Sequence, residues 1–301
     1  MALEAGFRKF DTAEADWWYD QKSVGLALSD WFGKDLVDDD ECIPNDGTCS
    51  AASPTRCEFD ELRISTKIPP WSLTSHDDIR ATARASRQEL VGFCDDGDSL
   101  FPLDVYYIHA PACWKGWHAR CDNPPPNLLN IYDAWRAMEA VAGIDGSAKR
   151  IGLSNIWPQD LQALIQYVKD RKQRGELDPP PRIPDVLQAF ADPLQPAEEL
   201  RRICAEHGIE FVSYSTLGTQ HRDGRNPVLT HPTIVGLAAK YQRSVAEVVL
   251  SWALQNNMSV IPRSSKLQHI QELARLLPDD NRAFLSQDDL QAIDKMKQTT
   301  G

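Results

Sequence analysis

A carboxylate and a phenol lie close together near the start of the chain, and a phenol donates a proton at neutral pH only if a cation stabilises its anion. Residues 7–10 place two basic side chains between two phenylalanines, a short run that we interpret as a strand, and the strand ends at Asp11. An aromatic-rich loop containing Tyr19 follows. Asp11 and Tyr19 are therefore predicted to share one strand-to-helix loop, where an α/β barrel keeps its chemistry. Taken alone, the two residues are also explained by a turn cap and by aromatic packing.

Polar side chains follow the later predicted strands as well. The polar residues at or just past strand ends are Asp11, Tyr19, Lys67, His109, Ser154, Asn155, Gln188, Tyr214 and Arg263. In a parallel barrel the residues just past each strand converge on one face. The sequence therefore predicts one cluster that contains a carboxylate, a phenol, an ammonium and an imidazole.

Strands and helices alternate along the chain, which favours one α/β domain. The predicted strands are 7–10, 62–66, 104–108, 150–153, 186–190, 209–212 and 258–261. The predicted helices are 24–32, 75–90, 128–141, 158–168, 197–207, 231–241, 244–254, 263–277 and 286–301. We predict a single domain over 1–301 that folds as a (β/α)8 TIM barrel with about seven recognisable strand-helix units, and an exposed polar insertion at 34–58.

Local signals mark several helix ends. Ser75 and Ser286 precede acidic first turns and are predicted N-caps. Ser244 and Glu247 have the spacing of a capping box. Gly208 is predicted to end the helix before it.

Composition limits the class of partner. The chain has 301 residues, of which 42% are hydrophobic and 25% charged, as in a globular protein with an ample core. Its net charge of −12 argues against binding to nucleic acid or to an anionic membrane. No apolar run approaches the roughly 20 residues that cross a bilayer, and the start of the chain has no signal-peptide core. We expect a cytoplasmic protein, a monomer or weak homo-oligomer, whose partner is a small molecule.

The cysteines are seven in number and irregularly spaced, which fits a reducing compartment. Cys42, Cys49 and Cys57 lie in one predicted loop, and Cys113 and Cys121 lie in another. Neither set has paired C-x-x-C spacing. We therefore expect neither a metal site nor a disulfide.

The chain resembles the aldo-keto reductase family from Gly6 to the C-terminal helix. The segments GFRKFDTA, YDQKSVG, ISTK, YYIHAP, IGLSN, VLQ, YSTLG and IPRSS occur in the family's order. Each segment alone is a weak signal, whereas the ordered set is specific. The resemblance implies reduction of an aldehyde or ketone by hydride from NADPH, with a catalytic tetrad at Asp11, Tyr19, Lys67 and His109.

The four residue types suit that reaction. Negative charge develops on the carbonyl oxygen during reduction, and Tyr19 would donate the proton as general acid. Lys67 would supply the stabilising cation, and Asp11 would keep that ammonium charged. His109 would hold the substrate oxygen near Tyr19. Trp18 is an alternative match to the family's catalytic tyrosine, but only Tyr19 has an acidic hydroxyl.

Two structural alternatives remain for this tetrad. Asp11 with Lys67 would also be explained by an ion pair at the barrel mouth, and His109 by a satisfied core histidine. The cofactor residues have similar alternatives, namely strand-end packing and an exposed basic turn.

The resemblance also implies a set of cofactor residues. They are Ser154, Asn155, Gln188, Tyr214, Ser215, Leu217, Arg263, Ser264, Ser265, His269 and Glu272. Ser154, Asn155 and Gln188 would bind the carboxamide, and Tyr214 would stack on the nicotinamide ring. The family uses no G-x-G-x-x-G loop, and none follows a strand here.

The segment from Arg263 to Lys266 favours NADPH over NADH. These residues are predicted to open a helix, where free N–H groups and a guanidinium favour a phosphate. His269 stands where the family often has an arginine, which weakens that preference, and Glu272 matches a contact on the adenine side.

By the same resemblance, Trp18, Trp114 and Trp117 would bind the substrate. Aromatic walls suit bulky apolar or aromatic carbonyl compounds, but tryptophans in a loop are also explained by packing against the barrel rim. A second reading of the chain is a nucleotide-binding regulatory member or a pseudoenzyme with little turnover.

The family normally begins earlier, with an N-terminal hairpin and a first barrel strand, and the resemblance implies that this chain lacks both. A misassigned start codon, a shortened enzyme and a fold retained without turnover are the three explanations. The presence of all four tetrad types favours the first two.

Overall fold

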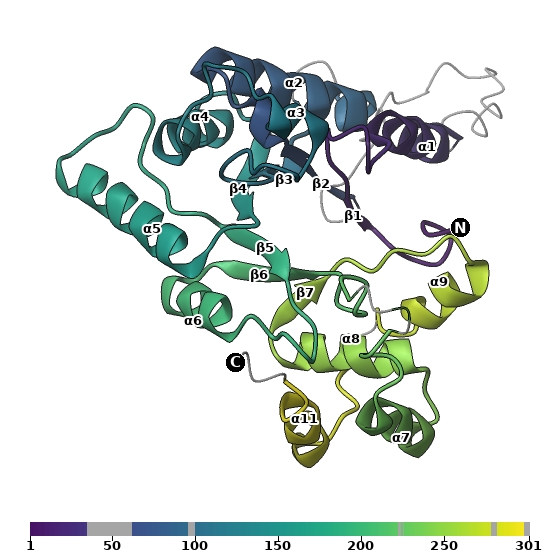
Figure 1. Ribbon diagram of the computed structural model, residues 1–301. Coiled ribbons are helices and arrows are strands. Elements are labelled where there is room, and N and C mark those ends of the chain that lie inside the picture. Colours follow the sequence, from purple (N-terminus) through teal and green to yellow (C-terminus); the bar gives the residue numbers. More distant parts are fainter. Residues whose placement is uncertain (35–61, 96–99, 222–223, 225, 278–281, 298–301) are drawn as a thin grey trace, which may run out of the picture. The chain divides into compact units, whose positions relative to one another are not determined.

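Residues 1–34, 62–95, 100–221, 224, 226–277 and 282–297 are described by the computed structural model of the chain (Figure 1). They group into two compact units. The N-terminal unit comprises the described residues of 9–153 and 163–184, and the C-terminal unit comprises 1–8, 154–162 and the described residues from 185 onward. The predicted insertion at 34–58 lies outside the described residues, apart from residue 34, and the single domain over 1–301 stays a prediction.

Parallel strands form the centre of each unit. In the N-terminal unit, β1 (Lys9–Asp11), β2 (Arg63–Ile68), β3 (Leu103–Ile108) and β4 (Ala148–Ser154) pair in sequence order, although Ser154 itself belongs to the C-terminal unit. In the C-terminal unit, β5 (Val186–Phe190), β6 (Glu210–Tyr214) and β7 (Met258–Val260) pair in the same way. Each predicted strand is confirmed to within two residues at either end. All six residues of β3 are buried, as its continuous apolar run predicts.

The helices of the N-terminal unit cover the sheet formed by β1 to β4. They are α1 (Gln21–Lys34), α2 (His76–Val91), α3 (Ala119–Asp122), α4 (Ile131–Gly143) and α5 (Pro158–Gln173), with 3-10 turns η1 (Pro70–Ser72) and η2 (Gly92–Cys94); α5 begins in the C-terminal unit. Helix α2 packs on β2 and β3 and lies beside both α1 and α4 (Figure 1). A Cβ at Gly25 would lie 2.2 Å from the carbonyl oxygen of Glu89, so glycine lets α1 approach α2 closely.

The C-terminal unit contains α6 (Glu198–His207), α7 (Pro232–Tyr241), α8 (Val245–Gln255), α9 (Leu267–Ala274) and α11 (Gln287–Asp294). The capping box of Ser244 and Glu247 is confirmed at α8. Ser286 caps α11, and Gly208 ends α6 in the left-handed conformation at φ 68°, as predicted. Among the described residues, no helix combines the length and the apolar character that crossing a membrane requires.

Several predicted helix boundaries are wrong by about one helical turn, among them the end predicted at residue 168, since α5 continues to Gln173. The helix predicted to start at residue 128 starts at Ile131, because the side chain of Asn130 accepts hydrogen bonds from the backbone N–H groups of Tyr132 and Asp133. The residues from Arg263 to Lys266 precede α9 rather than opening it, and Lys266 is its N-cap.

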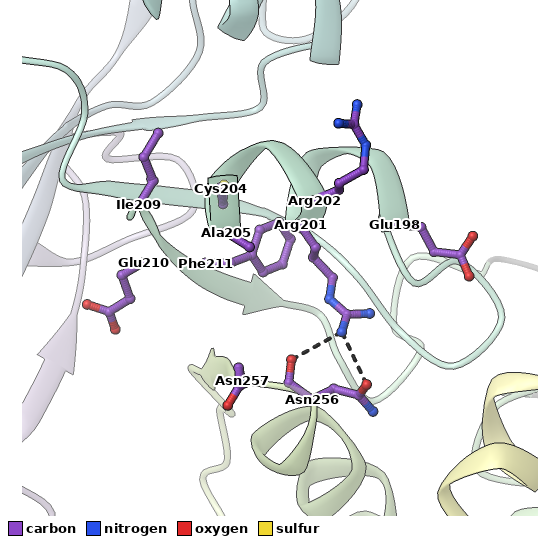
Figure 2. A pocket seen from close by; sticks show the side chains of 10 residues that line it. All are labelled: Glu198, Arg201, Arg202, Cys204, Ala205, Ile209, Glu210, Phe211, Asn256 and Asn257. Atoms are coloured by element: carbon purple, nitrogen blue, oxygen red, sulfur yellow. Dashed lines mark hydrogen bonds between the residues drawn. The ribbon is translucent and has the colours of Figure 1, made fainter. Parts of the chain in front are cut away.

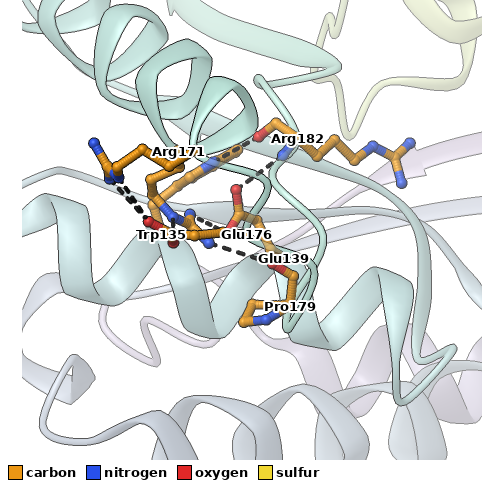
Figure 3. A network of polar contacts seen from close by, with 7 residues as sticks. Trp135, Glu139, Arg171, Glu176, Pro179 and Arg182 are labelled. Atoms are coloured by element: carbon orange, nitrogen blue, oxygen red, sulfur yellow. Dashed lines mark hydrogen bonds and ion pairs between the residues drawn. The ribbon is translucent and has the colours of Figure 1, made fainter.

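A buried ion pair fixes α4 to α5 in the N-terminal unit (Figure 3). The fully buried Arg171 donates from Nη1 to Glu139 Oε2 at 2.6 Å and from Nε to Glu176 Oε2 at 2.7 Å. Glu139 Oε1 accepts a hydrogen bond from the backbone N–H of Arg182 at 2.9 Å. The carbonyl oxygen of Arg182 accepts a hydrogen bond from Trp135 Nε1 at 2.8 Å. The network therefore also holds the segment that leaves α5.

Replacing Arg171 with methionine is expected to lower the free energy of unfolding by about 3 kcal/mol, because Glu139 is then left buried without its cation. Arg174→Met is the matched control: its exposed guanidinium pairs with Glu176 at 2.8 Å, and its loss is expected to cost less than about 1 kcal/mol. Urea unfolding of the two variants measures the difference. Equal effects would show that the buried pair adds no stability.

Candidate active site

The ammonium of Lys67 is held at the carboxyl ends of β1 and β2. Its side chain is fully buried, and Nζ donates to Asp11 Oδ2 at 2.5 Å and to the carbonyl oxygen of Thr12 at 2.7 Å. Burial lowers the pKa of Lys67, and the charge and hydrogen bond of Asp11 act in the opposite direction. The carboxylate thus favours the charged amine in a site that disfavours charge.

Tyr19 and His109 lie beside this ion pair. Lys67 Nζ is 5.1 Å from the ring centroid of Tyr19, and the Tyr19 and His109 rings are 5.8 Å apart at 68°. The structure therefore brings all four predicted tetrad residues together within the N-terminal unit. Trp18 lies on the same loop with its ring centroid 6.3 Å from that of His109, and it is more exposed than Tyr19.

His109 is a neutral base in this environment. Burial, followed by the nearby charge of Lys67, lowers the pKa of His109 to about 3. At neutral pH the imidazole therefore carries no charge, so it can orient an oxygen through a hydrogen bond but is not a cationic acid.

Aromatic side chains surround the imidazole. The ring of Trp117 lies 5.5 Å from that of His109 at 87° and 5.4 Å from that of Trp18. Trp114 reaches Trp117 at 6.1 Å. All three tryptophans predicted to bind substrate therefore join one cluster beside His109.

The expectation that the cysteines are unpaired is wrong in this cluster, since Cys113 and Cys121 form a disulfide. The turn from Trp114 to Trp117 and the short helix α3 bring their Cα atoms to 4.9 Å, within the range a disulfide needs. Sequence spacing gave no signal because the pairing depends on the path of an irregular loop. Cys42, Cys49 and Cys57 lie outside the described residues.

Glu14 is a further candidate residue of this site that the sequence alone did not reveal. Its Oε1 accepts hydrogen bonds from Ser86 and Tyr106, each at 2.7 Å, and its backbone N–H donates to the carbonyl oxygen of Lys67 at 3.1 Å. Burial raises the pKa of the Glu14 carboxyl to about 8. The residue therefore fixes the loop after β1 to β2, β3 and α2. Its position three residues after Asp11 was the available signal.

Replacing Glu14 with glutamine is expected to change how stability depends on pH. The folded-state pKa is about 8 against 4.5 as the ordinary value, so the folded protein holds a proton that the unfolded chain releases in this range. Stability should therefore fall by about 1.4 kcal/mol per pH unit from about pH 5 to pH 8 in the native protein. Glutamine has no proton to release in this range. The free energy of unfolding of Glu14→Gln should therefore match that of the native protein near pH 5 and exceed it at pH 8.5.

Urea unfolding across this pH range measures that difference. Glu89→Gln is the control, because its exposed carboxylate accepts from Gln21 at 2.8 Å beside the same network. Parallel stability curves for native protein and Glu14→Gln would contradict a protonated Glu14.

The predicted nicotinamide residues form a network in the C-terminal unit. Tyr214 donates from its hydroxyl to Asn155 Oδ1 at 2.6 Å, and Asn155 Nδ2 donates to Ser154 Oγ at 3.1 Å. The backbone N–H of Asn155 donates to the carbonyl oxygen of Gln188 at 3.3 Å. Asn155 and Ser215 have φ of 56° and 52°, a conformation that costs energy in residues other than glycine and clusters at functional sites.

The remaining predicted cofactor residues surround the start of α9 in the same unit. Arg263, Ser265, Lys266 and His269 are exposed. The other members are Ser264, which caps the N–H of Lys266 at 3.1 Å, Glu272, which accepts from Gln268 at 3.0 Å, and Leu217, which packs on an apolar cluster of α8 and α9.

A pocket of about 460 Å³ lies at the amino ends of β6 and β7, away from the carboxyl ends that carry the predicted cofactor residues (Figure 2). It is lined by Ile209 and Glu210 at the amino end of β6 and by Asn256 and Asn257 before β7. Arg201 crosses it and donates to the Asn256 carbonyl at 3.1 Å. Since barrel chemistry occurs at carboxyl strand ends, this pocket is not the candidate site.

Similar sequences include named reductases. The chain is 30% identical over 225 residues to aldo-keto reductase family 1 member A1 of Xenopus tropicalis, a match that covers 71% of this chain and 62% of that protein. It is 29% identical over 254 residues to the NAD(P)H-dependent D-xylose reductase XYR1 of Pyricularia oryzae, covering 73% and 72%. The chain thus spans less than two thirds of the first relative's length.

Solved structures show the same fold. An aldo-keto reductase of Bombyx mori in complex with NADP superposes with a TM-score of 0.72 at 23% identity, covering 98% of this chain and 80% of that one. An aldo/keto reductase of Brucella melitensis gives 0.67 at 24% identity, covering 98% and 87%. The predicted (β/α)8 fold class is thereby confirmed. The model of the aldo/keto reductase family matches residues 1–298, and the chain belongs to that family.

Proposed function

We propose that this protein reduces an aldehyde or ketone to an alcohol with NADPH, with Tyr19 as the general acid. The observation that carries this proposal is the buried ammonium of Lys67, held by Asp11 at 2.5 Å and placed 5.1 Å from the Tyr19 ring. A buried cation beside a phenol stabilises the phenolate that proton transfer leaves behind.

Each member of the tetrad has one task in this reaction. NADPH supplies the hydride when it is bound. Tyr19 donates its hydroxyl proton to the carbonyl oxygen as negative charge develops there. Lys67 stabilises the resulting phenolate, and Asp11 keeps Lys67 charged. The neutral imidazole of His109 orients the carbonyl oxygen toward Tyr19.

The residues of the C-terminal unit fit a nicotinamide dinucleotide. Ser154, Asn155 and Gln188 offer the hydrogen-bonding groups a carboxamide needs, and Tyr214 offers an aromatic face. The strained backbone at Asn155 supports a binding role for this network. The exposed cations Arg263 and Lys266 suit a phosphate on the adenosine side, which favours NADPH. The Bombyx mori neighbour was crystallised with NADP.

Titration of the protein with NADPH and with NADH, followed by quenching of tryptophan fluorescence, tests the cofactor assignment. We expect the native protein to bind NADPH more tightly than NADH. Arg263→Ala should reduce the difference in affinity between the two cofactors. Assays with a panel of aromatic and aliphatic aldehydes then test turnover. NADPH binding without turnover would favour a nucleotide-binding regulatory role, and absence of binding would contradict both.

A further inference from the structure

The disulfide between Cys113 and Cys121 closes a short loop directly after the catalytic histidine. Strand β3 ends at Ile108, His109 follows it, and the cyclised segment begins four residues later. We call residues 113–121 the disulfide loop. A cross-link across so short a segment restricts the conformations of the residues inside it.

The disulfide loop contacts the tetrad through its aromatic side chains. Trp117 packs edge-to-face on His109 at 5.5 Å, and His118 stacks on Trp71 at 4.5 Å. Cys121 is buried in a cluster with Ala15 and Trp71, against which Tyr19, Cys113 and Trp117 also pack. One sulfur of the disulfide is thus anchored in the apolar base of the candidate site.

Within the described part of the chain, the hydrogen bonds of the disulfide loop are short-range. Trp117 N–H donates to the carbonyl of Trp114 at 3.1 Å, and Gly116 N–H donates to Asp122 Oδ1 at 2.7 Å. The ion pair from Arg120 to Asp16 joins two exposed side chains at 3.5 Å, a kind of contact that contributes little. These hydrogen bonds form a turn but do not attach the disulfide loop to the sheet. The disulfide bonds Cys113 to the buried Cys121.

We propose that the Cys113–Cys121 disulfide determines substrate specificity by positioning Trp117 against His109. This inference rests on the proposed carbonyl reduction. With the loop closed, the indole forms a fixed wall beside the reacting oxygen, and a flat aromatic carbonyl compound gains a stacking surface there. With the loop open, the wall is lost, whereas the ion pair of Lys67 with Asp11 and the strand that precedes His109 lie outside the loop.

The switch between the two forms is a two-electron reduction. A thiolate of a dithiol such as dithiothreitol attacks one sulfur, the S–S bond breaks, and a mixed disulfide forms. The second thiol of the reagent displaces the protein sulfur, which takes up a proton. Two cysteine thiols and the cyclic oxidised reagent result.

The test compares the native protein with the double variant Cys113→Ala/Cys121→Ala on a bulky and a small aldehyde, 2-naphthaldehyde and propanal. The KM for naphthaldehyde is expected to rise by about fivefold to tenfold in the double variant, as loss of an aromatic contact predicts. The kcat and KM for propanal should stay within about twofold, because no wall contact is involved. Trp117→Ala should likewise raise the KM for naphthaldehyde, and should raise it little further when added to the double variant.

Two controls isolate the disulfide. Cys204→Ala removes a buried free cysteine and should leave both substrates unaffected. Because Cys94 is also disulfide-bonded, reductant is applied to native protein and double variant alike. Dithiothreitol should raise the KM for naphthaldehyde only in the native protein.

An unchanged KM for naphthaldehyde in the double variant, or equal loss on both aldehydes, would overturn the proposal. Near-ultraviolet circular dichroism gives a readout independent of turnover, because Trp117 couples to Trp18 and Trp71 at 5.4 and 6.0 Å. The aromatic bands should change in the double variant and not in Cys204→Ala. If the native protein reduces no aldehyde, the proposed function fails, and an unchanged dichroism spectrum would separately reject the positioning of Trp117.

Discussion

Tyr19→Phe is expected to lower kcat for carbonyl reduction by about 100-fold or more, because the proposed general acid is removed while the ring remains. The phenylalanine ring can still pack beside His109 and over the ammonium of Lys67, which lies 5.1 Å from the ring centroid. NADPH binding should be unchanged. Cofactor oxidation at the nicotinamide absorption band, measured with saturating aldehyde, gives the comparison.

Trp18→Phe is the matched control for that variant. Trp18 is the neighbour that competes for the role by sequence position, and its ring is 6.3 Å from that of His109. Its replacement is expected to alter KM more than kcat, since an indole has no acidic hydroxyl. A larger fall in kcat for Trp18→Phe than for Tyr19→Phe would move the chemistry away from Tyr19.

Asp11→Asn is expected to produce an activity loss that grows with pH. Burial already lowers the pKa of Lys67, and the carboxylate of Asp11 is what raises it again. Without that charge the ammonium loses its proton at lower pH, so the cation disappears as pH rises. The value of kcat/KM should fall modestly at pH 6 and by about 100-fold at pH 8.

The pH profile of kcat/KM distinguishes this effect from simple damage to the fold. Asp16→Asn changes an exposed carboxylate in the same loop and should leave the profile of the native protein unchanged. A loss in Asp11→Asn that is equal at all pH values would mean that Asp11 positions the loop without supporting the charge of Lys67.

Much of the fold follows from local rules that the sequence displays. The capping box at Ser244 and the glycine at 208 fix helix ends through contacts only a few residues apart, so pattern alone predicted them. The continuous apolar run of β3 likewise identified a buried strand. The grouping of Asp11, Lys67 and His109 followed from one topological rule, that parallel strands present their carboxyl ends on one face.

The features that the sequence did not reveal depend on contacts between distant or irregular segments. Glu14 is placed by Ser86 and Tyr106, which lie 72 and 92 residues away, and no local pattern encodes those hydrogen bonds. The disulfide of Cys113 and Cys121 depends on the path of a loop without regular structure. The cytoplasmic location, the oligomeric state and the roles of the site residues stay predictions.

The most direct test of the proposed reduction is isotope transfer from NADPH that carries deuterium at the hydride-donating carbon of the nicotinamide. Benzaldehyde is incubated with the labelled cofactor and either native protein or Tyr19→Phe, and the benzyl alcohol is examined by mass spectrometry. One deuterium is expected on the alcohol carbon with native protein, and at least about 100-fold less labelled alcohol is expected with the variant. Equal amounts of labelled alcohol from both proteins, or none from native protein that binds NADPH, would contradict this expectation.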